Sequence, residues 1–326
     1  MQNGTVRWGI LSAAKIARKW VCPAIHKSER GHVAAVASRD LARARALADL
    51  FGARAMGDYE ALLDDPNIDA IYIPLPNAAH VEWTRRCLEA GKHVLCEKPL
   101  ALKAEEIEAL IAARDASGKF AAEAFMVTHH PQWHRVRDLV REGAIGALRH
   151  VQAAFSFNNP DPNNIRNMPD QGGGALRDIG VYPSVVTRFV TGAEPEAIRA
   201  TIDWELGIDA TARVSADFPG FGLDFYVSMR MAPRQFVTFH GDEGWLTLHT
   251  PFNAQLYGDS VLEHRTLDGR ITLERFPLAD QYCAQADAFA DTILDGADYA
   301  CPLEFSLGNQ RVIDMIYAAA DGARSE

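Results

Sequence analysis

The stretch GILSAAKIA, from Gly9 to Ala17, ends an apolar run that begins at Val6. A buried strand, a tight turn of small residues and a helix can place backbone N–H groups against a phosphate. The three positions that favour small residues in such a turn hold Ser12, Ala14 and Ala17. Two of the usual glycines are therefore missing, although the third position accepts alanine. Taken alone, the stretch fits a dinucleotide-binding turn and an ordinary strand-turn-helix equally well.

Short apolar runs alternate with helical patterns through the first 125 residues. Strands that are continuously apolar and separated by helices indicate a parallel sheet covered on both faces. The sequence therefore predicts a doubly wound sheet of the Rossmann type. The predicted strands are Val6–Leu11, His32–Ser38, Arg54–Met56, Ile68–Pro76 and Lys92–Pro99. Helices are predicted after the first strand (disturbed at Pro23), from Leu41 to a stop at Gly52, near 78–90 and near 104–117.

The pattern changes after Phe125, where one helix and a long strand are followed by several strands from Ala197 onward. GLDFYVSMR places Leu223, Phe225, Val227 and Met229 on one face, which is the period of two typical of an antiparallel sheet with unlike faces. Helical patterns return near 281–294 and 305–320. We expect a dinucleotide-binding domain over residues 1–124. Residues 125–326 then form an α+β domain with a large open, mainly antiparallel sheet, which binds substrate and forms a homodimer or higher oligomer.

Composition excludes several classes of partner. The formal charge of −10 repels nucleic acid and anionic membranes. No apolar stretch approaches the ~20 residues of a membrane span, and the N-terminus lacks a leader pattern. Five cysteines without a CxxC pair indicate free thiols in a reducing compartment. The sequence thus predicts a cytoplasmic protein.

The second predicted strand ends at Ser38, before Arg39 and Asp40. An acidic residue at this place binds the ribose 2′-hydroxyl of NAD, whereas arginine accommodates the 2′-phosphate of NADP. Because Ser38 is small and neutral, Arg39 favours NADP. NAD remains the alternative if Asp40 is the ribose-binding residue.

Four stretches together resemble the glucose–fructose oxidoreductase / inositol dehydrogenase family, Gfo/Idh/MocA. They are GILSAAKIA, LPNAAH (Leu75–His80), GKHVLCEKPLAL (Gly91–Leu102) and GGGALRDIGVYP (Gly172–Pro183). Asn164–Arg166 and Tyr182 are most similar to NADP-linked pentose and glucose dehydrogenases and to dimeric dihydrodiol dehydrogenases. The resemblance implies that Lys98 and Tyr182 share acid/base duty.

Physical reasoning on the same residues points to a proton-handling site. Lys98 lies at a strand end, where open α/β sheets bind ligands. A tyrosine with a pKa of about 10 is a poor base at neutral pH, and a nearby ammonium would favour its phenolate and stabilise alkoxide charge. Asp178 is four residues before Tyr182, a spacing that shares one face of a helix, although Pro183 can kink it. The alternatives are a structural lysine and a core tyrosine.

The expected site residues fall into three groups. Catalytic residues are Lys98, Tyr182 and Asp178. Expected cofactor contacts are Gly9, Ser12, Ala13, Ala14, Lys15, Ile16, Ser38, Arg39, Leu75, Pro76, Asn77, His80, Glu97, Lys98 and Arg166. Expected substrate contacts are Lys98, His129, Phe157, Arg166, Asp178 and Tyr182. HHPQWH (His129–His134) has no acidic residue or cysteine at ligand spacing, so no metal is expected.

These features favour an NADP(H)-dependent oxidoreductase that transfers hydride to or from a carbinol or carbonyl carbon of a sugar or polyol. Alternatives within the class are a trans-dihydrodiol dehydrogenase and an anhydrosugar reductase of the 1,5-anhydrofructose type. A dinucleotide-binding regulator without activity is the alternative from another class. Such a regulator needs none of Lys98, Asp178 and Tyr182.

Overall fold

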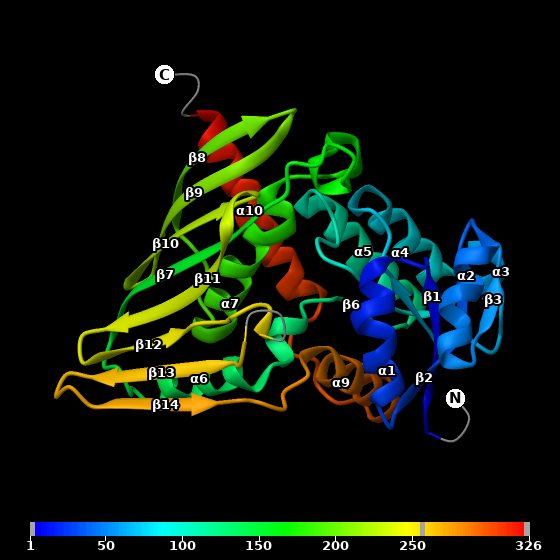
Figure 1. Cartoon of the computed structure of the whole chain (residues 1–326), viewed down its shortest axis with the longest axis horizontal. Coiled ribbons are helices and arrows are strands. Elements are labelled where there is room, and N and C mark those ends of the chain that lie inside the picture. The colour runs from blue at the N-terminus through cyan, green and yellow to red at the C-terminus, as the bar shows by residue number, and fades with distance from the viewer. Residues whose placement is uncertain (1–3, 255–257, 323–326) are drawn as a thin grey trace. The chain divides into compact units, whose positions relative to one another are not determined.

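The computed structural model describes residues 4–254 and 258–322, which form two compact units. The first unit contains the chain up to His129 together with Asp280–Leu307. The second contains His130–Ala279 and the chain from Gly308 onward. Figure 1 shows the elements of both units.

The first unit is built on a parallel six-stranded sheet with the order β3-β2-β1-β4-β5-β6. This is the doubly wound order in which the chain reverses direction across the sheet between β1 and β4, so the predicted Rossmann-type sheet is confirmed. The strands are β1 (Val6–Leu11), β2 (Gly31–Ala37), β3 (Arg54–Met56), β4 (Ala70–Ile73), β5 (His93–Cys96) and β6 (Ala121–Glu123). The helices are α1 (Cys22–Lys27), α2 (Leu41–Ala48), α3 (Tyr59–Leu63), α4 (His80–Glu89), α5 (Ala104–Ser117) and α9 (Gln281–Asp295).

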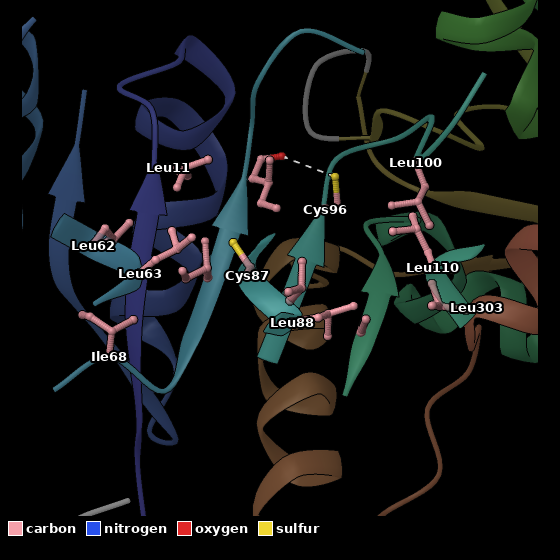
Figure 2. Close-up of a cluster of buried hydrophobic side chains, with 14 of the residues drawn as sticks. Leu11, Leu62, Leu63, Ile68, Cys87, Leu88, Cys96, Leu100, Leu110 and Leu303 are labelled. Atoms are coloured by element: carbon pink, nitrogen blue, oxygen red, sulfur yellow. Dashed lines mark hydrogen bonds between the residues drawn. The ribbon is translucent and has the colours of Figure 1, made fainter. Parts of the chain in front are cut away.

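Apolar side chains cover one face of this sheet and fill the space beneath α3, α4 and α5 (Figure 2). Leu11 from β1 and Leu62 from α3 are fully buried in this cluster, as are Cys87 and Leu88 from α4. The Cys96 thiol at the end of β5 lies 4.0 Å from the Ile73 carbonyl oxygen of β4. The strand β4 is apolar at every position because both faces of the sheet are buried there.

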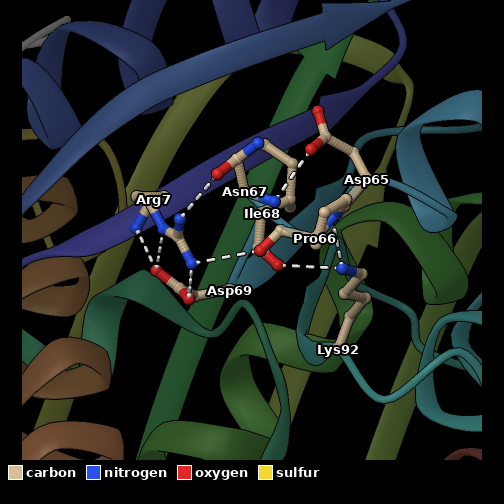
Figure 3. A network of polar contacts seen from close by, with 7 residues as sticks. All are labelled: Arg7, Asp65, Pro66, Asn67, Ile68, Asp69 and Lys92. Carbon is tan, nitrogen blue, oxygen red and sulfur yellow. Dashed lines mark hydrogen bonds and ion pairs between the residues drawn. The ribbon is translucent and has the colours of Figure 1, made fainter. Parts of the chain in front are cut away.

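Charged side chains link neighbouring strands at the edge of the sheet where the strands begin, the amino-terminal edge (Figure 3). Arg7 on β1 forms an ion pair with Asp69, which precedes β4, at 2.7 Å. Lys92, which precedes β5, donates to the carbonyl oxygens of Asp65 and Ile68 at 2.6 and 2.9 Å. These polar residues bind one another and so stabilise the fold. Open α/β sheets bind ligands at the other edge, where the strands end.

Helix α9 belongs to the first unit, although in the chain it follows the long segment His130–Ala279 of the second unit. Phe289 on α9 is fully buried, and its ring lies 4.9 Å from Trp8 on β1 and 5.1 Å from Phe120. The sequence-based division had placed every residue after 124 in the second domain. The helical periodicity of 281–294 identifies an apolar face but does not specify which sheet covers it.

The second unit contains an eight-stranded sheet with the order β14-β13-β12-β11-β7-β10-β9-β8. Its pairs are antiparallel except β10 with β7, which run parallel. The predicted open, mainly antiparallel sheet is confirmed. The strands are β7 (Leu148–Asn158), β8 (Ala197–Glu205), β9 (Ile208–Phe218), β10 (Phe221–Ser228), β11 (Arg230–Gly241), β12 (Gly244–Leu248), β13 (Val261–Thr266) and β14 (Ile271–Arg275).

Helices of this unit pack against one face of the sheet. They are α6 (Pro131–Arg141), α7 (Val181–Thr191) and the second half of α10 (Leu303–Gly322). On β10, Leu223, Phe225 and Val227 are buried beneath them, while Asp224 is exposed, as the alternation predicted. Ser228 departs from the pattern because its buried hydroxyl lies 2.7 Å from that of Thr211. Among residues 4–254 and 258–322, no helix combines the length and apolar character needed to cross a bilayer.

Candidate active site

The turn after β1 has an unusual backbone conformation at Ser12. Ser12 adopts φ 137°, a conformation that favours glycine, at the first of the two positions where glycines were missing. Gly9 is needed for packing, because a Cβ there would lie 3.0 Å from side-chain atoms of Leu62 and Ile68. The following helix begins when the Arg18 N–H bonds the Ala14 carbonyl, and it passes through a π-helical turn, Ala17–Val21, into α1. Pro23 sits in the first turn of α1, where no N–H is required, so the helix continues.

The residues after β2 discriminate between the two candidate ribose contacts. The Asp40 carboxylate accepts the N–H groups of Ala42 and Arg43 at 2.9 and 3.3 Å and so caps α2. The Ser38 hydroxyl oxygen accepts the Asp40 N–H at 3.2 Å. Arg39 is exposed, and within the described ranges no ion-pair partner engages it. The turn therefore offers a guanidinium rather than a carboxylate.

His80 joins the loops that follow β4 and β5. It is fully buried, with Nε2 at 2.8 Å from the Leu75 carbonyl oxygen and Nδ1 at 2.7 Å from that of Pro99. A neutral imidazole donates to one of these carbonyls, and the protonated ring donates to both. The side chain thus fixes the loops on either side of it. Leu75, Pro76 and Asn77 lie half-buried in the first of these loops.

Lys98 lies in a turn whose backbone N–H groups form hydrogen bonds with neighbouring carboxylates. The neighbouring Glu97 carboxylate accepts the Tyr72 hydroxyl at 2.5 Å and the Lys98 N–H at 3.3 Å. The Glu123 carboxylate accepts the Leu100 N–H at 2.8 Å. Burial raises the pKa of Glu123 to about 7, against the opposing effects of that hydrogen bond and of the Lys98 charge. Lys98 itself is half-buried at the carboxyl end of β5.

The remaining expected catalytic residues lie in the second unit. Arg166 Nε donates to the Asp178 carboxylate at 2.6 Å. Asp178 belongs to a π-helical turn, Leu176–Gly180, that leads directly into α7, where Tyr182 is the second residue. The wider turn changes the one-face relation that four-residue α-helical spacing predicts. Turns of this kind occur often at functional sites.

The Tyr182 ring is packed among aromatic side chains. Its centroid lies 5.3 Å from that of Phe252, in a stacked arrangement, and 5.8 Å from Phe155. Phe157, an expected substrate contact, lies 6.5 Å from Phe155 on the same strand. Gln235 Oε1 accepts the N–H groups of Phe252 and Asn253, which fixes the stacking partner of Tyr182.

The three histidines of HHPQWH have different surroundings. The His129 ring lies 4.9 Å from the Tyr299 ring in the first unit. His130 caps α6 by accepting the Gln132 N–H, and its Nε2 lies 3.1 Å from the Ser260 hydroxyl. His134 Nδ1 lies 3.1 Å from Arg137. In the part of the chain that the structure describes, no three His, Cys, Asp or Glu side chains are arranged to hold a metal ion.

The expected site residues therefore gather separately within each unit. In the first unit, the Ser12 turn, Ser38–Arg39, the Leu75–Asn77 loop and Lys98 all follow the carboxyl ends of strands. In the second unit, Arg166, Asp178 and Tyr182 are linked through one short segment. Sequence reasoning missed Glu123, Asp209 and Phe252. For Glu123 and Asp209, the only signal in the sequence is an acidic residue within an apolar stretch. The contacts that define all three residues join parts of the chain that are far apart.

Comparison with known proteins gives matches over both units. Residues 6–125 match the model of an oxidoreductase family with an NAD-binding Rossmann fold, and residues 133–247 match a GFO/IDH/MocA C-terminal domain. An uncharacterised oxidoreductase of Rhizobium meliloti is 42% identical, covering 97% of each chain. A D-xylose 1-dehydrogenase (NADP(+)) of Haloferax volcanii is 36% identical over 96% of this chain and 97% of its own.

A solved structure of similar architecture is a mutant 3-ketoreductase from Actinomadura kijaniata in complex with TDP-benzene and NADP. It has a TM-score of 0.90 and 31% identity, covering 97% of this chain and 98% of that one. The resemblance noted from four short stretches is thus confirmed over nearly the whole length. The chain belongs to the GFO/IDH/MocA oxidoreductase family, whose N-terminal domain is an NAD-binding Rossmann fold.

Proposed function

We propose that the protein is an NADP(H)-dependent oxidoreductase that acts on a carbinol or carbonyl carbon of a sugar or polyol. The observation that carries this proposal is the Lys98 turn at the carboxyl end of β5. Its backbone N–H groups donate hydrogen bonds to the carboxylates of Glu97 and Glu123. These bonds fix the backbone that carries the cationic side chain, which a reaction with developing negative charge needs and a binding protein without activity does not. The relatives that are named as an NADP-linked xylose dehydrogenase and an NADP-bound ketoreductase support the substrate class.

The residues after β1 and β2 fit a dinucleotide. The Ser12 turn and the start of the next helix would hold the pyrophosphate, since the first N–H groups of a helix lack intrahelical partners. Arg39 would bind the 2′-phosphate of NADP, because Asp40 is engaged in capping α2. His80 then acts on the cofactor through the two loops it joins, rather than by contact.

When bound, the nicotinamide accepts or donates the hydride. In the oxidative direction, Tyr182 removes the hydroxyl proton of the substrate, and the positive charge of Lys98 stabilises developing alkoxide charge. In reduction, the same hydroxyl returns the proton. Asp178, held by Arg166, orients the substrate hydroxyl or the tyrosine. Lys98, His129, Phe157 and Arg166 are the further proposed substrate contacts.

The test is the kinetics of Lys98→Met and Tyr182→Phe, after NADP⁺ and NAD⁺ reduction have been screened over aldoses, polyols and dihydrodiols. General acid–base groups contribute about 10²–10⁴-fold, so each variant should lose kcat in that range. Fluorescence titration should show that both still bind NADPH. Lys119→Met, placed between α5 and β6 at the opposite edge of the sheet, is the matched control and should keep wild-type kcat.

Two results would overturn the proposal. Wild-type turnover by both variants would exclude Lys98 and Tyr182 as the acid–base groups. NADPH binding without turnover of any substrate class would favour the non-catalytic regulator.

Two further features belong to the proposal. All five cysteines are free thiols, which supports a cytoplasmic location. The exposed face of the eight-stranded sheet is proposed to bind a second copy of the chain.

A further inference from the structure

Asp209 is a buried carboxylate that the chemistry above does not use. It lies near the start of β9, and 1% of its surface is exposed. Its Oδ2 accepts the backbone N–H of Leu176 at 2.6 Å, and its Oδ1 accepts the Tyr317 hydroxyl at 2.8 Å. Both carboxylate oxygens are therefore engaged, one by the segment that precedes α7 and one by α10. A buried charge is retained at such a place only when hydrogen bonds compensate its desolvation.

Other charged groups act on this pair from the elements packed around it. Arg177, on the π-helical turn, acts electrostatically on Asp209, and its guanidinium lies 5.4 Å from the centre of the Tyr317 ring. Asp314 on α10 acts on Tyr317. Burial raises the pKa of Asp209 to about 6, while the bonds from Leu176 and Tyr317 and the Arg177 charge oppose that rise. The carboxyl group of Asp209 therefore titrates near pH 6.

The Asp209 carboxylate lies against the backbone that leads to the expected catalytic residues. Gly174 has φ 126°, and a Cβ at this position would lie 1.9 Å from Asp209 Oδ1, so only glycine fits. The Gly174 N–H bonds the Arg166 carbonyl at 2.9 Å, and the Asp178 N–H bonds the Gly174 carbonyl at 3.1 Å. The carboxylate thus fixes Leu176, two residues before Asp178 and six before Tyr182.

We propose that Asp209 and Tyr317 are positioning residues of the proposed active site, which together fix the start of the helical segment that carries Asp178 and Tyr182. Neither residue touches the reacting atoms in this proposal. Asp209 acts through the Leu176 N–H, and Tyr317 holds Asp209 in the orientation that this bond requires. The inference rests on the proposed function, in which Asp178 and Tyr182 serve the reaction.

The proposal has a consequence for pH dependence. Ionised Asp209 accepts from both donors, whereas the protonated carboxyl carries a hydrogen on one of those oxygens and loses an acceptor. The kcat should therefore fall as the pH drops through about 6. Because the Tyr317 hydrogen bond lowers the pKa of Asp209, Tyr317→Phe should move this acid limb to higher pH. Asp209→Asn, which does not ionise, should remove it.

The experiment measures kcat and KM from pH 5 to 9 for the wild type, Asp209→Asn, Tyr317→Phe and the double variant. At pH 7.5, Asp209→Asn should lower kcat about 10- to 100-fold, the range expected for misplaced catalytic groups. The KM for NADPH should stay at its wild-type value, because the dinucleotide is held by the first unit. Asp268→Asn, in the turn between β13 and β14, is the control and should change neither kcat nor the acid limb.

Hydrogen exchange supplies a readout that does not depend on turnover. Amides of residues 174–182 should exchange faster in Asp209→Asn and, to a smaller extent, in Tyr317→Phe, because the anchor of Leu176 is weakened. Exchange in β13 and β14 should stay unchanged. Tyr317→Phe removes one hydroxyl only, so it keeps the test valid if Asp209→Asn fails to fold.

An acid limb at the same pH in all variants, or unchanged exchange over residues 174–182, would overturn the positioning role. Failure of the proposed function is a separate result. It appears as wild-type turnover by Tyr182→Phe and Lys98→Met, whatever the Asp209 series shows.

Discussion

At the scale of single residues, Arg39 is the side chain that we propose sets the preference between NADP and NAD. Its exposed guanidinium follows β2, and the neighbouring carboxylate is engaged by the α2 backbone. We expect NADPH to bind more tightly than NADH. Arg39→Ala should remove most of that preference, about 10- to 100-fold, because a charge-assisted hydrogen bond is worth about 1.5–3 kcal/mol. Titration of both cofactors checks this, with the exposed Arg45→Ala on α2 as control. Equal affinities in the wild type would contradict it.

Glu123 should make the stability of the protein depend on pH. Its folded-state pKa of about 7 exceeds the ordinary value of 4.5, so the folded protein binds more protons than the unfolded chain between these values. The free energy of unfolding therefore falls as the pH rises through this window. Glu123→Gln keeps an acceptor for the Leu100 N–H and removes the titration. Relative to the wild type, this variant should gain at most about 3 kcal/mol between pH 4.5 and 7.

Urea unfolding at several pH values measures this difference. The exposed Glu105→Gln on α5 is the matched control and should follow the wild type at every pH. A constant difference between Glu123→Gln and the wild type would show that Glu123 titrates normally.

At the scale of elements, α9 stabilises the first unit through the buried ring of Phe289. Phe289 packs against Trp8 and Phe120, and Arg30 forms ion pairs with Asp291 and Asp295 of the same helix. Phe289→Ala should lower the free energy of unfolding by about 3–5 kcal/mol, the cost of deleting a buried ring. Leu278→Ala, at a side chain that is 96% exposed, should change it by less than about 0.5 kcal/mol. Denaturant unfolding of both variants checks this, and equal effects would refute the docking role of α9.

The helices and strands also show which parts of the fold local sequence patterns predict. The β1, β3 and α5 bounds agree with the predicted ones because apolar periodicity and closing residues such as Gly118 are local signals. The π-helical turns were not predictable, since the flanking residues keep a helical pattern through them. The parallel pairing of β10 with β7 and the return of α9 depend on which distant surfaces meet. Local patterns do not encode that choice.

The candidate site also contains residues that the sequence predicts and residues that it does not. Lys98, Asp178 and Tyr182 stand in stretches whose spacing is visible in the sequence. The residues that hold these stretches in place are not visible in the sequence. Glu123 accepts a hydrogen bond from a residue 23 positions earlier, and Asp209 accepts one from a residue 33 positions earlier. Asp40 illustrates the other limit, because the sequence does not show that its carboxylate caps α2.

At the scale of the whole molecule, the face of the eight-stranded sheet away from the helices is the surface that we propose binds a second copy. A hollow of about 510 Å³ lies on this sheet beside Gln152, Arg213, Tyr226 and Phe236. Arg199 pairs with Asp217 and Arg213 with Asp203, so both charge signs alternate across exposed strands. Such a surface can face a copy of itself about a twofold axis, since each arginine can meet an aspartate of the partner.

We therefore expect a dimer or larger homo-oligomer at micromolar concentration, joined through this sheet. Tyr226→Glu replaces an aromatic ring that lines the hollow with a carboxylate, so a second copy would have to remove that charge from water. Sedimentation velocity should then show a shift towards monomer, while Lys119→Glu in the first unit should sediment as the wild type does. Since Tyr226 lies on the face away from the helices, circular dichroism should show the same fold in both variants. A wild type that sediments as a monomer, or a Tyr226→Glu variant with unchanged mass, would exclude this face as the interface.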